Sequence, residues 1–164
     1  MEQMRIAAYV KLAKLWERNR NQALTYHQGY YKEKIKRLPD AVLVDTYIDI
    51  TGQKRIAKRP EMLRLLRDCS LRKIDCIMTQ TQAYLAANAS EFCYLLKFIF
   101  DMNASIEIVT EDEAYSLDTL LNLDDQREAL KKMANDYVGL DRTAYESWKS
   151  AVVEGIKLLA IENA

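Results

Sequence analysis

Two short stretches of the sequence hold side chains that could act on a phosphate. The first, "YVKLA" (9–13), ends an apolar run, and the second, "TGQKRIAKR" (51–59), carries four cations. Lysine and arginine neutralise phosphate oxygens, so the second stretch predicts a weak, non-specific and salt-dependent contact with phosphate groups. The residues of this predicted contact are Lys54, Arg55, Lys58 and Arg59.

A third stretch, "TQTQAYLAAN" (79–88), is unusual because it carries no charge. It lies between a strand-like run and a helix-like run, and in α/β proteins the turn from strand to helix is where ligands bind and catalytic groups stand. Acids, bases or glycines are expected at such a turn, whereas this one holds mainly alanine, threonine and glutamine.

The sequence offers little for a metal or a cofactor. Cys69, Cys76 and Cys93 have no close paired spacing and His27 is the only histidine, whereas a structural zinc site takes four such ligands, usually in close pairs. Only four glycines are present, which argues against a glycine-rich loop around a nucleotide. We therefore predict no metal, no cofactor and three buried free thiols in a reducing compartment.

The composition is that of an ordinary globular domain of 164 residues, with 49% hydrophobic and 29% charged residues. No apolar run approaches the roughly 20 residues of a membrane span, and the N-terminus lacks a signal-peptide pattern. We expect a cytoplasmic protein with no membrane partner. Residues 1–75 hold 17 Lys and Arg against 9 Asp and Glu, and residues 76–164 hold 7 against 15. This asymmetry suits a polyanion or a head-to-tail partner, or reflects uneven charges on solvated helices.

Strand-like and helix-like runs alternate over the first two thirds of the chain. The predicted strands are 5–10, 41–48, 73–79 and 105–111, and the predicted helices cover 21–37, a run opened by Pro60, and 89–103 with Ser90 as its cap. Alternation of this kind, with continuously apolar strands, predicts a parallel sheet covered on both faces. The expected fold is a three-layer α/β/α domain with a mainly parallel sheet of four or five strands, followed by C-terminal helices.

Beyond residue 116 the pattern is helical only. One helix is expected to end at Gly139, and Thr143 with Glu146 has the spacing of a capping box for the next. We therefore divide the chain into a domain at 1–116 and a helical segment at 117–164, used for packing or dimerisation. Its apolar stripe is made of Tyr145, Trp148, Val152, Ile156 and Leu159.

The order and spacing of several pieces resemble the catalytic domain of the serine recombinases, the resolvase/invertase family, over roughly residues 4–115. The pieces are "RIAAYVKLAK", "TYHQ", "YIDITG", "KRPEMLRLLRDC", "KIDCIMT", "LAANASEFCYLLKFI" and "IEIVTE". The resemblance implies the α/β/α fold, assembly into dimers and tetramers, and an activity in which a serine attacks a DNA phosphodiester. Family members normally continue into a separate DNA-binding domain, and no such element is recognisable here.

The catalytic positions of that family are altered in this sequence. A Tyr-x-Arg-x-Ser pattern stands here as Tyr9, Lys11 and Ala13, and an alanine methyl has no lone pair with which to attack phosphorus. The family's later acidic or serine position is Ala83 here, and its two arginines, which clamp the phosphate, are replaced by Tyr84 and Ala87. The resemblance carries three further site residues over unchanged: Gln28, Asp49 and Arg59.

These departures predict a recombinase-like domain that is catalytically inactive and acts as a regulatory or protein- and DNA-binding module. Its expected partners are DNA, a copy of itself or an active recombinase. One alternative is an active strand-exchange enzyme with another nucleophile, for which the nearby candidates are Ser70, Thr81 and Ser90. Another is a small phosphate-ligand domain, with the ligand at Ala13, Arg59 and Tyr84.

Overall fold

The computed structural model describes residues 3–111 and 123–162. At its centre is a sheet of four parallel strands in the order β2-β1-β3-β4. The prediction of a mainly parallel sheet of four or five strands is confirmed. The strands are β1 (Met4–Leu12), β2 (Ala41–Ile50), β3 (Cys76–Thr79) and β4 (Glu107–Thr110).

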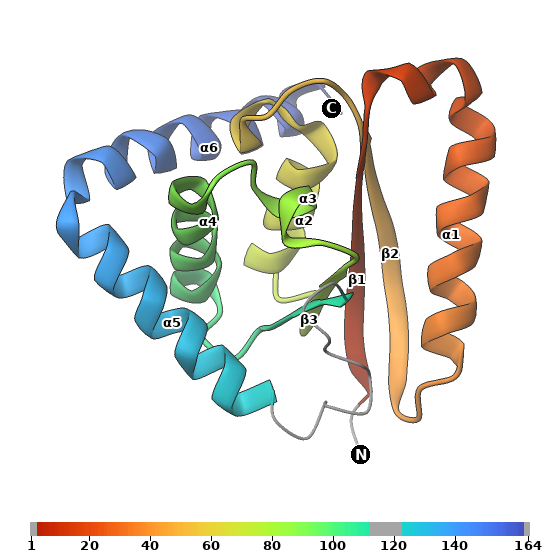
Figure 1. Cartoon of the computed structure of the whole chain (residues 1–164), viewed down its shortest axis with the longest axis horizontal. Helices are drawn as coiled ribbons and strands as arrows, with labels where there is room; N and C mark the ends of the chain where they lie inside the picture. Colours follow the sequence, from red (N-terminus) through yellow and green to blue (C-terminus); the bar gives the residue numbers. More distant parts are fainter. Residues whose placement is uncertain (1–2, 112–122, 163–164) are drawn as a thin grey trace.

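Helices cover both faces of the sheet and give the predicted three layers (Figure 1). A 3-10 helix, η1 (Lys14–Asn19), leads into α1 (Arg20–Lys36), which packs on one face. On the other face lie α2 (Pro60–Ser70) and α4 (Ala89–Met102). Two shorter elements, η2 (Ile56–Lys58) and α3 (Gln82–Leu85), stand in the loops that follow β2 and β3.

The alternation of side chains along β1 explains why the whole strand is apolar. Ile6, Ala8 and Val10 pack in the core beneath α1, whereas Ala7 and Tyr9 pack in the core beneath α2 and α4. Both faces of a central parallel strand are therefore dry, as its continuous apolar run predicted.

Three predicted helix ends differ from the structure. Asn88 rather than Ser90 caps α4, because its side chain accepts a hydrogen bond from Glu91 N at 2.8 Å. Thr143 lies inside α6, and Asp141 instead accepts from Ala144 N at 3.1 Å. In both helices the cap is an Asn or Asp side chain that is better placed to accept from the free N–H groups of the first turn. The α5 helix continues past Gly139 to Leu140.

The C-terminal helices α5 (Leu123–Leu140) and α6 (Arg142–Glu162) lie outside α4 and α2 (Figure 1). Their residues Ala134 and Val152 belong to the core that α2 and α4 form with the sheet, and Tyr145 is 1% exposed. The other stripe residues, among them Trp148, pack against the same core. The stripe thus packs on its own domain, and the predicted boundary at 116/117 falls outside the described residues.

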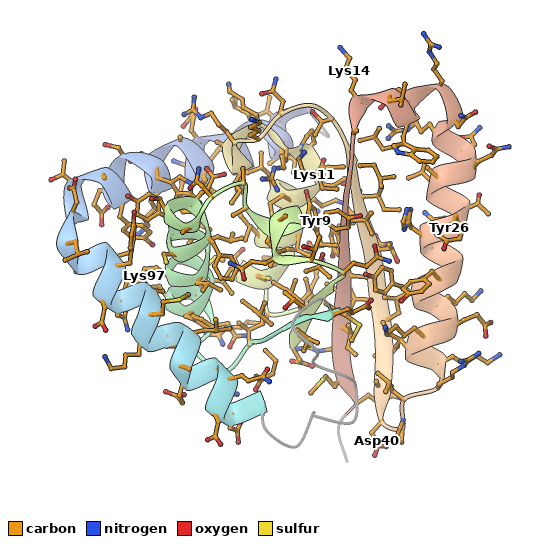
Figure 2. All side chains as sticks on the ribbon, in the orientation of Figure 1. Tyr9, Lys11, Lys14, Tyr26, Asp40 and Lys97 are labelled. Atoms are coloured by element: carbon orange, nitrogen blue, oxygen red, sulfur yellow. The ribbon has the colours of Figure 1, made fainter. Side chains whose placement is uncertain are left out.

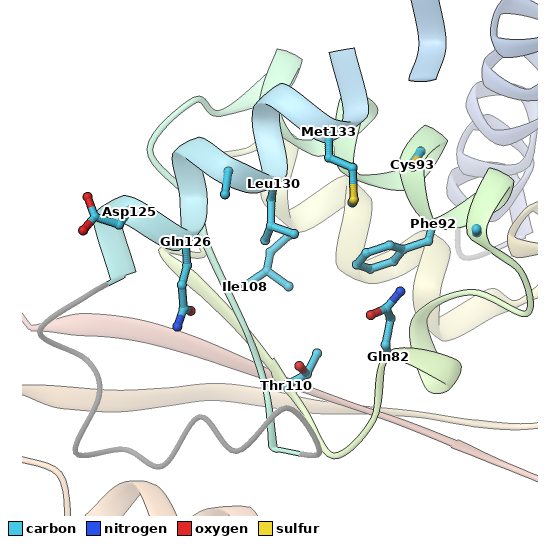
Figure 3. Close-up of a pocket in the computed structure, with 11 residues that line it drawn as sticks. Gln82, Phe92, Cys93, Ile108, Thr110, Asp125, Gln126, Leu130 and Met133 are labelled. Carbon is cyan, nitrogen blue, oxygen red and sulfur yellow. The ribbon is translucent and has the colours of Figure 1, made fainter. Parts of the chain in front are cut away.

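A mostly apolar cavity of about 440 Å³ lies between α4, α5 and β4 (Figure 3). Phe92, Ile108 and Leu130 line it, and Cys93, whose thiol pKa is raised by burial, contributes no reactive thiolate. Within the described residues, no helix is long and apolar enough to cross a membrane.

Candidate functional site

The parallel strands end together at one edge of the sheet. Leu12 of β1 pairs with Ile50 of β2, and Tyr9 pairs with Thr79 of β3. Ala13 therefore follows β1 beside the loop 51–59, while α3, in the stretch 79–88, packs against β1. We call this region the carboxyl edge; Figure 2 shows Lys11 and Lys14 near the same end of β1, with Asp40 at the opposite end of the sheet.

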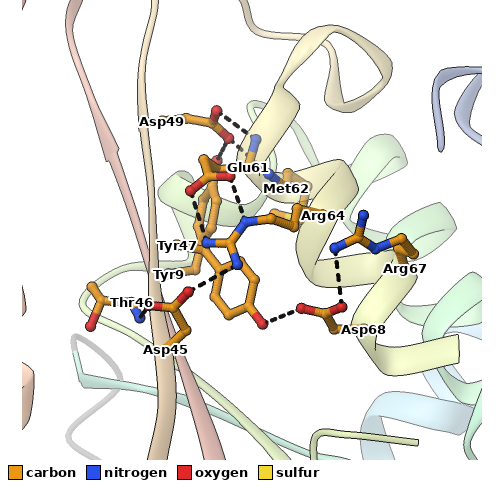
Figure 4. Close-up of polar contacts among 10 residues, drawn as sticks. All are labelled: Tyr9, Asp45, Thr46, Tyr47, Asp49, Glu61, Met62, Arg64, Arg67 and Asp68. Carbon is orange, nitrogen blue, oxygen red and sulfur yellow. Dashed lines mark hydrogen bonds and ion pairs between the residues drawn. The ribbon is translucent and has the colours of Figure 1, made fainter. Parts of the chain in front are cut away.

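Tyr9 and Asp49 form a buried pair beneath this edge (Figure 4). The Tyr9 hydroxyl donates to Asp49 Oδ2 at 2.8 Å. The same carboxylate accepts from Glu61 N and Met62 N, both at 2.9 Å. Because these N–H groups belong to the first turn of α2, where no intrahelical partner exists, Asp49 caps that helix from the neighbouring strand.

Burial sets the protonation behaviour of this pair. Burial, followed by the charge of Asp49, raises the pKa of Tyr9 well above its ordinary value, so the phenol stays protonated and donates. Burial also raises the pKa of Asp49, against the lowering effect of its hydrogen bonds from Glu61, Tyr9 and Met62. Both groups act as hydrogen-bonding parts of the framework.

Arg59 is 0% exposed and joins two segments of the carboxyl edge. Its Nη1 donates to Tyr84 O at 2.8 Å and to Leu85 O at 3.0 Å, and its Nη2 donates to Lys54 O at 2.7 Å. Its guanidinium holds the loop 51–59 against α3. Arg59 was predicted as a DNA contact together with Lys54, Arg55 and Lys58, but its side chain is buried and does not reach the surface of the loop. Both of its Nη atoms already donate to backbone carbonyl groups, which disfavours Arg59 as a ligand of a small phosphate.

The remaining cations of the loop, Lys54, Arg55 and Lys58, are exposed. Lys11 lies close by, half-buried, with its Nζ 3.5 Å from Thr51 O. Burial, together with the positive charge of Arg59, lowers the pKa of Lys11. Burial is the larger of these two causes, and the charge of Asp49 acts in the opposite direction.

The positions that would carry the chemistry are on the surface. Ala13, Ala83 and Ala87 are all exposed, and Tyr84 is half-buried. Gln28 is exposed on α1, and no hydrogen bond within the described residues joins it to the Tyr9–Asp49 pair. The structure thus brings together every predicted site residue of the β1, β2 and β3 ends, but not Gln28.

The hydroxyl groups of the alternative nucleophiles take part in local hydrogen bonds. Ser70 stands at the last position of α2, the end away from the carboxyl edge, and donates to Arg67 O at 2.6 Å. Ser90 pairs with the Tyr137 hydroxyl, and the Thr81 hydroxyl accepts from Ala83 N. The partners of Ser70 and Ser90 are a backbone carbonyl and a tyrosine hydroxyl, and neither is the base or cation that activates a nucleophile.

Glu91 makes a structural contact that the sequence did not predict. Glu91 of α4 accepts from Ile56 N in the loop at 3.2 Å and from Trp148 Nε1 of α6 at 3.1 Å. It thereby ties the C-terminal helix to the cationic loop. The only sequence signal was the Asn88-x-x-Glu91 spacing, which is typical of a capping box and points to the helix end rather than to the loop.

Buried polar pairs also extend down α2 (Figure 4). The Tyr47 hydroxyl donates to Asp68 Oδ2 at 2.6 Å, and the Arg64 guanidinium lies 4.0 Å from the Tyr47 ring centroid. In residues 3–111 and 123–162, no group of three or more His, Cys, Asp or Glu is placed to hold a metal ion. All three cysteines are buried and free, and burial raises the pKa of Cys69 to about 12.

No family model and no curated protein matches the chain. Solved structures do match it: the N-terminal catalytic domain of TP901-1 integrase has a TM-score of 0.56 at 18% identity, over 84% of this chain and 98% of that one. The C-terminal catalytic domain of ISC1926 TnpA, an IS607-like serine recombinase, has a TM-score of 0.52 at 16% identity, over 96% and 99%.

A resolvase family site-specific recombinase from Streptococcus pneumoniae has a TM-score of 0.50 at 12% identity, over 90% of this chain and 99% of that one. The chain therefore has the fold of serine recombinase catalytic domains, as the resemblance implied.

Proposed function

We propose that this chain is a recombination-related domain that has lost DNA cleavage and acts as a regulatory, protein- and DNA-binding module. The observation that carries the proposal is the exposed methyl group of Ala13 at the end of β1. A covalent mechanism needs a nucleophile there, and a carbon without a lone pair cannot supply one. Ala87 likewise offers no cation for the charge that builds on a reacting phosphate.

The retained cations support a binding role. Lys54, Arg55 and Lys58 are exposed, and no ion pair within the described residues occupies them. Free cations of this kind bind the phosphate backbone without reading sequence, with an affinity that falls as salt rises. A copy of the chain or an active recombinase is the proposed protein partner, in the cytoplasm.

The test is a search for a covalent adduct on a denaturing gel with labelled DNA that carries a recombination site. We expect no shifted band from the natural chain and none from Ala13→Ser, because a lone hydroxyl without cations is a weak nucleophile. The combination of Lys11→Arg, Ala13→Ser, Tyr84→Arg and Ala87→Arg is the minimum set for rescue. A covalent band from the natural chain would identify a working enzyme and refute the proposal.

A further inference from the structure

An exposed aromatic pocket lies next to the carboxyl edge, on η1 and α1. Trp16 is 47% exposed and Tyr26 is 65% exposed. With Gln22, Ala23 and His27 they line a hollow of about 380 Å³, which we call the Trp16 pocket. Its volume falls in the range of about 300–1,000 Å³ that is typical of small-ligand sites, and Figure 2 labels Tyr26 on α1.

The pocket has the chemistry to hold a flat, uncharged ring. Two aromatic side chains offer faces for stacking, and the exposed amide of Gln22 can both donate and accept a hydrogen bond. His27 packs edge-on against Tyr26 with ring centroids 5.0 Å apart, and burial lowers its pKa, which favours the neutral imidazole. Large exposed aromatic surface beside a hollow marks an interaction site rather than ordinary surface.

The charge around the pocket selects the partner. Segments 11–20 and 51–59 contain four cations each, and Glu17 is their only acid. Glu17 is already paired with Arg20 at 2.8 Å. Within the described residues no ion pair engages Lys14 or Arg18, which are exposed on η1 beside Trp16. This surface is complementary to a polyanion.

Residues of η1 line two separate hollows in this region. A second hollow of about 540 Å³ lies between η1 and the loop, and is lined by Lys14, Glu17 and residues 50–53. The η1 helix therefore contributes Lys14 to this hollow and Trp16 to the aromatic pocket. A chain of phosphates and bases fits that arrangement, because its backbone needs cations and its bases need aromatic faces.

We propose that the Trp16 pocket receives an unpaired base of single-stranded nucleic acid whose phosphates lie on the cations of the carboxyl edge, an inference that rests on the proposed function. A duplex keeps its bases stacked inside, so only an unpaired base can reach the indole. Trp16 contributes affinity by stacking and does not read sequence.

The test measures fluorescence anisotropy of a labelled single strand of about 20 nucleotides, against the same sequence as a duplex. Trp16→Ala is expected to weaken single-strand binding about tenfold and to leave duplex binding unchanged. Trp16→Phe should keep most of the affinity. Leu15→Ala is the matched control, because Leu15 is 74% exposed on the same helix but does not line the pocket.

The salt dependence separates this inference from the proposed function. Lys54→Ala should lower the slope of log affinity against log salt by about one for both probes, whereas Trp16→Ala should leave that slope unchanged. One outcome is that Lys54→Ala lowers the salt slope while Trp16→Ala binds the single strand as tightly as the natural chain. In that case the inference fails and the proposed DNA contact stands. If neither the single strand nor the duplex binds, both this inference and the proposed DNA contact are refuted.

A change of sedimentation in Trp16→Ala without a change in binding would mean that the pocket is covered by protein, and would also overturn the inference. Unchanged circular dichroism and thermal melting of Trp16→Ala are expected as the folding control, since the side chain packs in neither core cluster.

Discussion

The buried and exposed parts of the carboxyl edge differ in the side chains that they carry. Tyr9, Asp49 and Arg59 lie beneath the edge, where Tyr9 bonds to Asp49, Asp49 accepts from backbone N–H groups, and the Nη atoms of Arg59 donate to backbone carbonyl groups. Ala13 and Ala87, at the surface, have no functional group. The polar residues that remain are the ones that the fold needs, because removing one leaves a buried donor or acceptor unpaired.

A polar residue that matches a catalytic position of the serine recombinases is therefore weak evidence of catalysis when it also stabilises the fold. Asp49 caps α2 and Arg59 joins the loop to α3, so both would be kept in a protein that performs no chemistry. The exposed positions carry no such structural duty, and for that reason they are the ones that report on function.

The largest effect that tests this comparison is expected from Arg59→Ala. The change removes the donor of three carbonyl groups, one buried and two partly buried, and leaves a cavity in place of the side chain. It should lower the free energy of unfolding by about 4 kcal/mol. Urea unfolding at neutral pH measures it. Arg55→Ala, on the exposed side of the same loop, should change it by less than about 0.5 kcal/mol; equal losses would mean that Arg59 is not a structural residue.

A second large effect is expected from Trp148→Ala, which breaks the tie between α6 and the loop. The indole stacks on Tyr145 with ring centroids 6.0 Å apart and donates to Glu91. Its loss should lower the thermal midpoint, with about 3 kcal/mol lost in the free energy of unfolding. Ser147→Ala, at an exposed position of the same helix, is the control. An unchanged midpoint would show that α6 is merely appended to the domain.

Much of the fold followed from local pattern, because each element satisfied its own rule. Pro60 opens α2 as expected, and the apolar runs became the buried parallel strands. The sequence also pointed to Tyr9, Asp49 and Arg59 through the resemblance. It did not reveal that Arg59 is buried, since the three carbonyls that hold it come from residues 54, 84 and 85, which meet only after folding.

The contact from Glu91 to Ile56 and Trp148 was beyond prediction for the same reason. Its two partners lie 35 and 57 residues from Glu91 along the chain, and a hydrogen bond across that separation has no periodic signature. The helix caps at Asn88 and Asp141 were not predicted for a different reason. Several capping residues stand close together at each site, and only the backbone direction selects among them.

A smaller effect on the free energy of unfolding, which changes with pH in a definite direction, is expected from Asp49→Asn. The change should cost about 1 kcal/mol at neutral pH through weaker hydrogen bonds. Because the folded-state pKa of Asp49 is raised, the native protein takes up a proton at a pH where the unfolded chain does not. The contribution of the carboxyl group to stability is therefore fully present below the ordinary pKa and is lost as pH rises through the folded-state pKa.

Asparagine does not titrate, so the stability difference between the natural chain and Asp49→Asn should widen as pH falls from 7 towards 4. Urea unfolding of both proteins across that interval measures it. A difference that narrows instead would mean that the hydrogen bonds from Glu61, Met62 and Tyr9 outweigh burial and hold the pKa below its ordinary value.

The smallest effects are expected at the exposed positions, and they sharpen the comparison most. Ala13→Ser and Ala87→Arg should each change the free energy of unfolding by less than about 0.5 kcal/mol, because surface side chains lose no packing. A clear loss of stability from either change would mean that alanine is kept there for the fold. With stability unchanged, the alanines owe nothing to folding, and a catalytic set would have been tolerated at these positions. The exposed positions would then differ from the buried network beneath them, where Asp49 and Arg59 serve the fold.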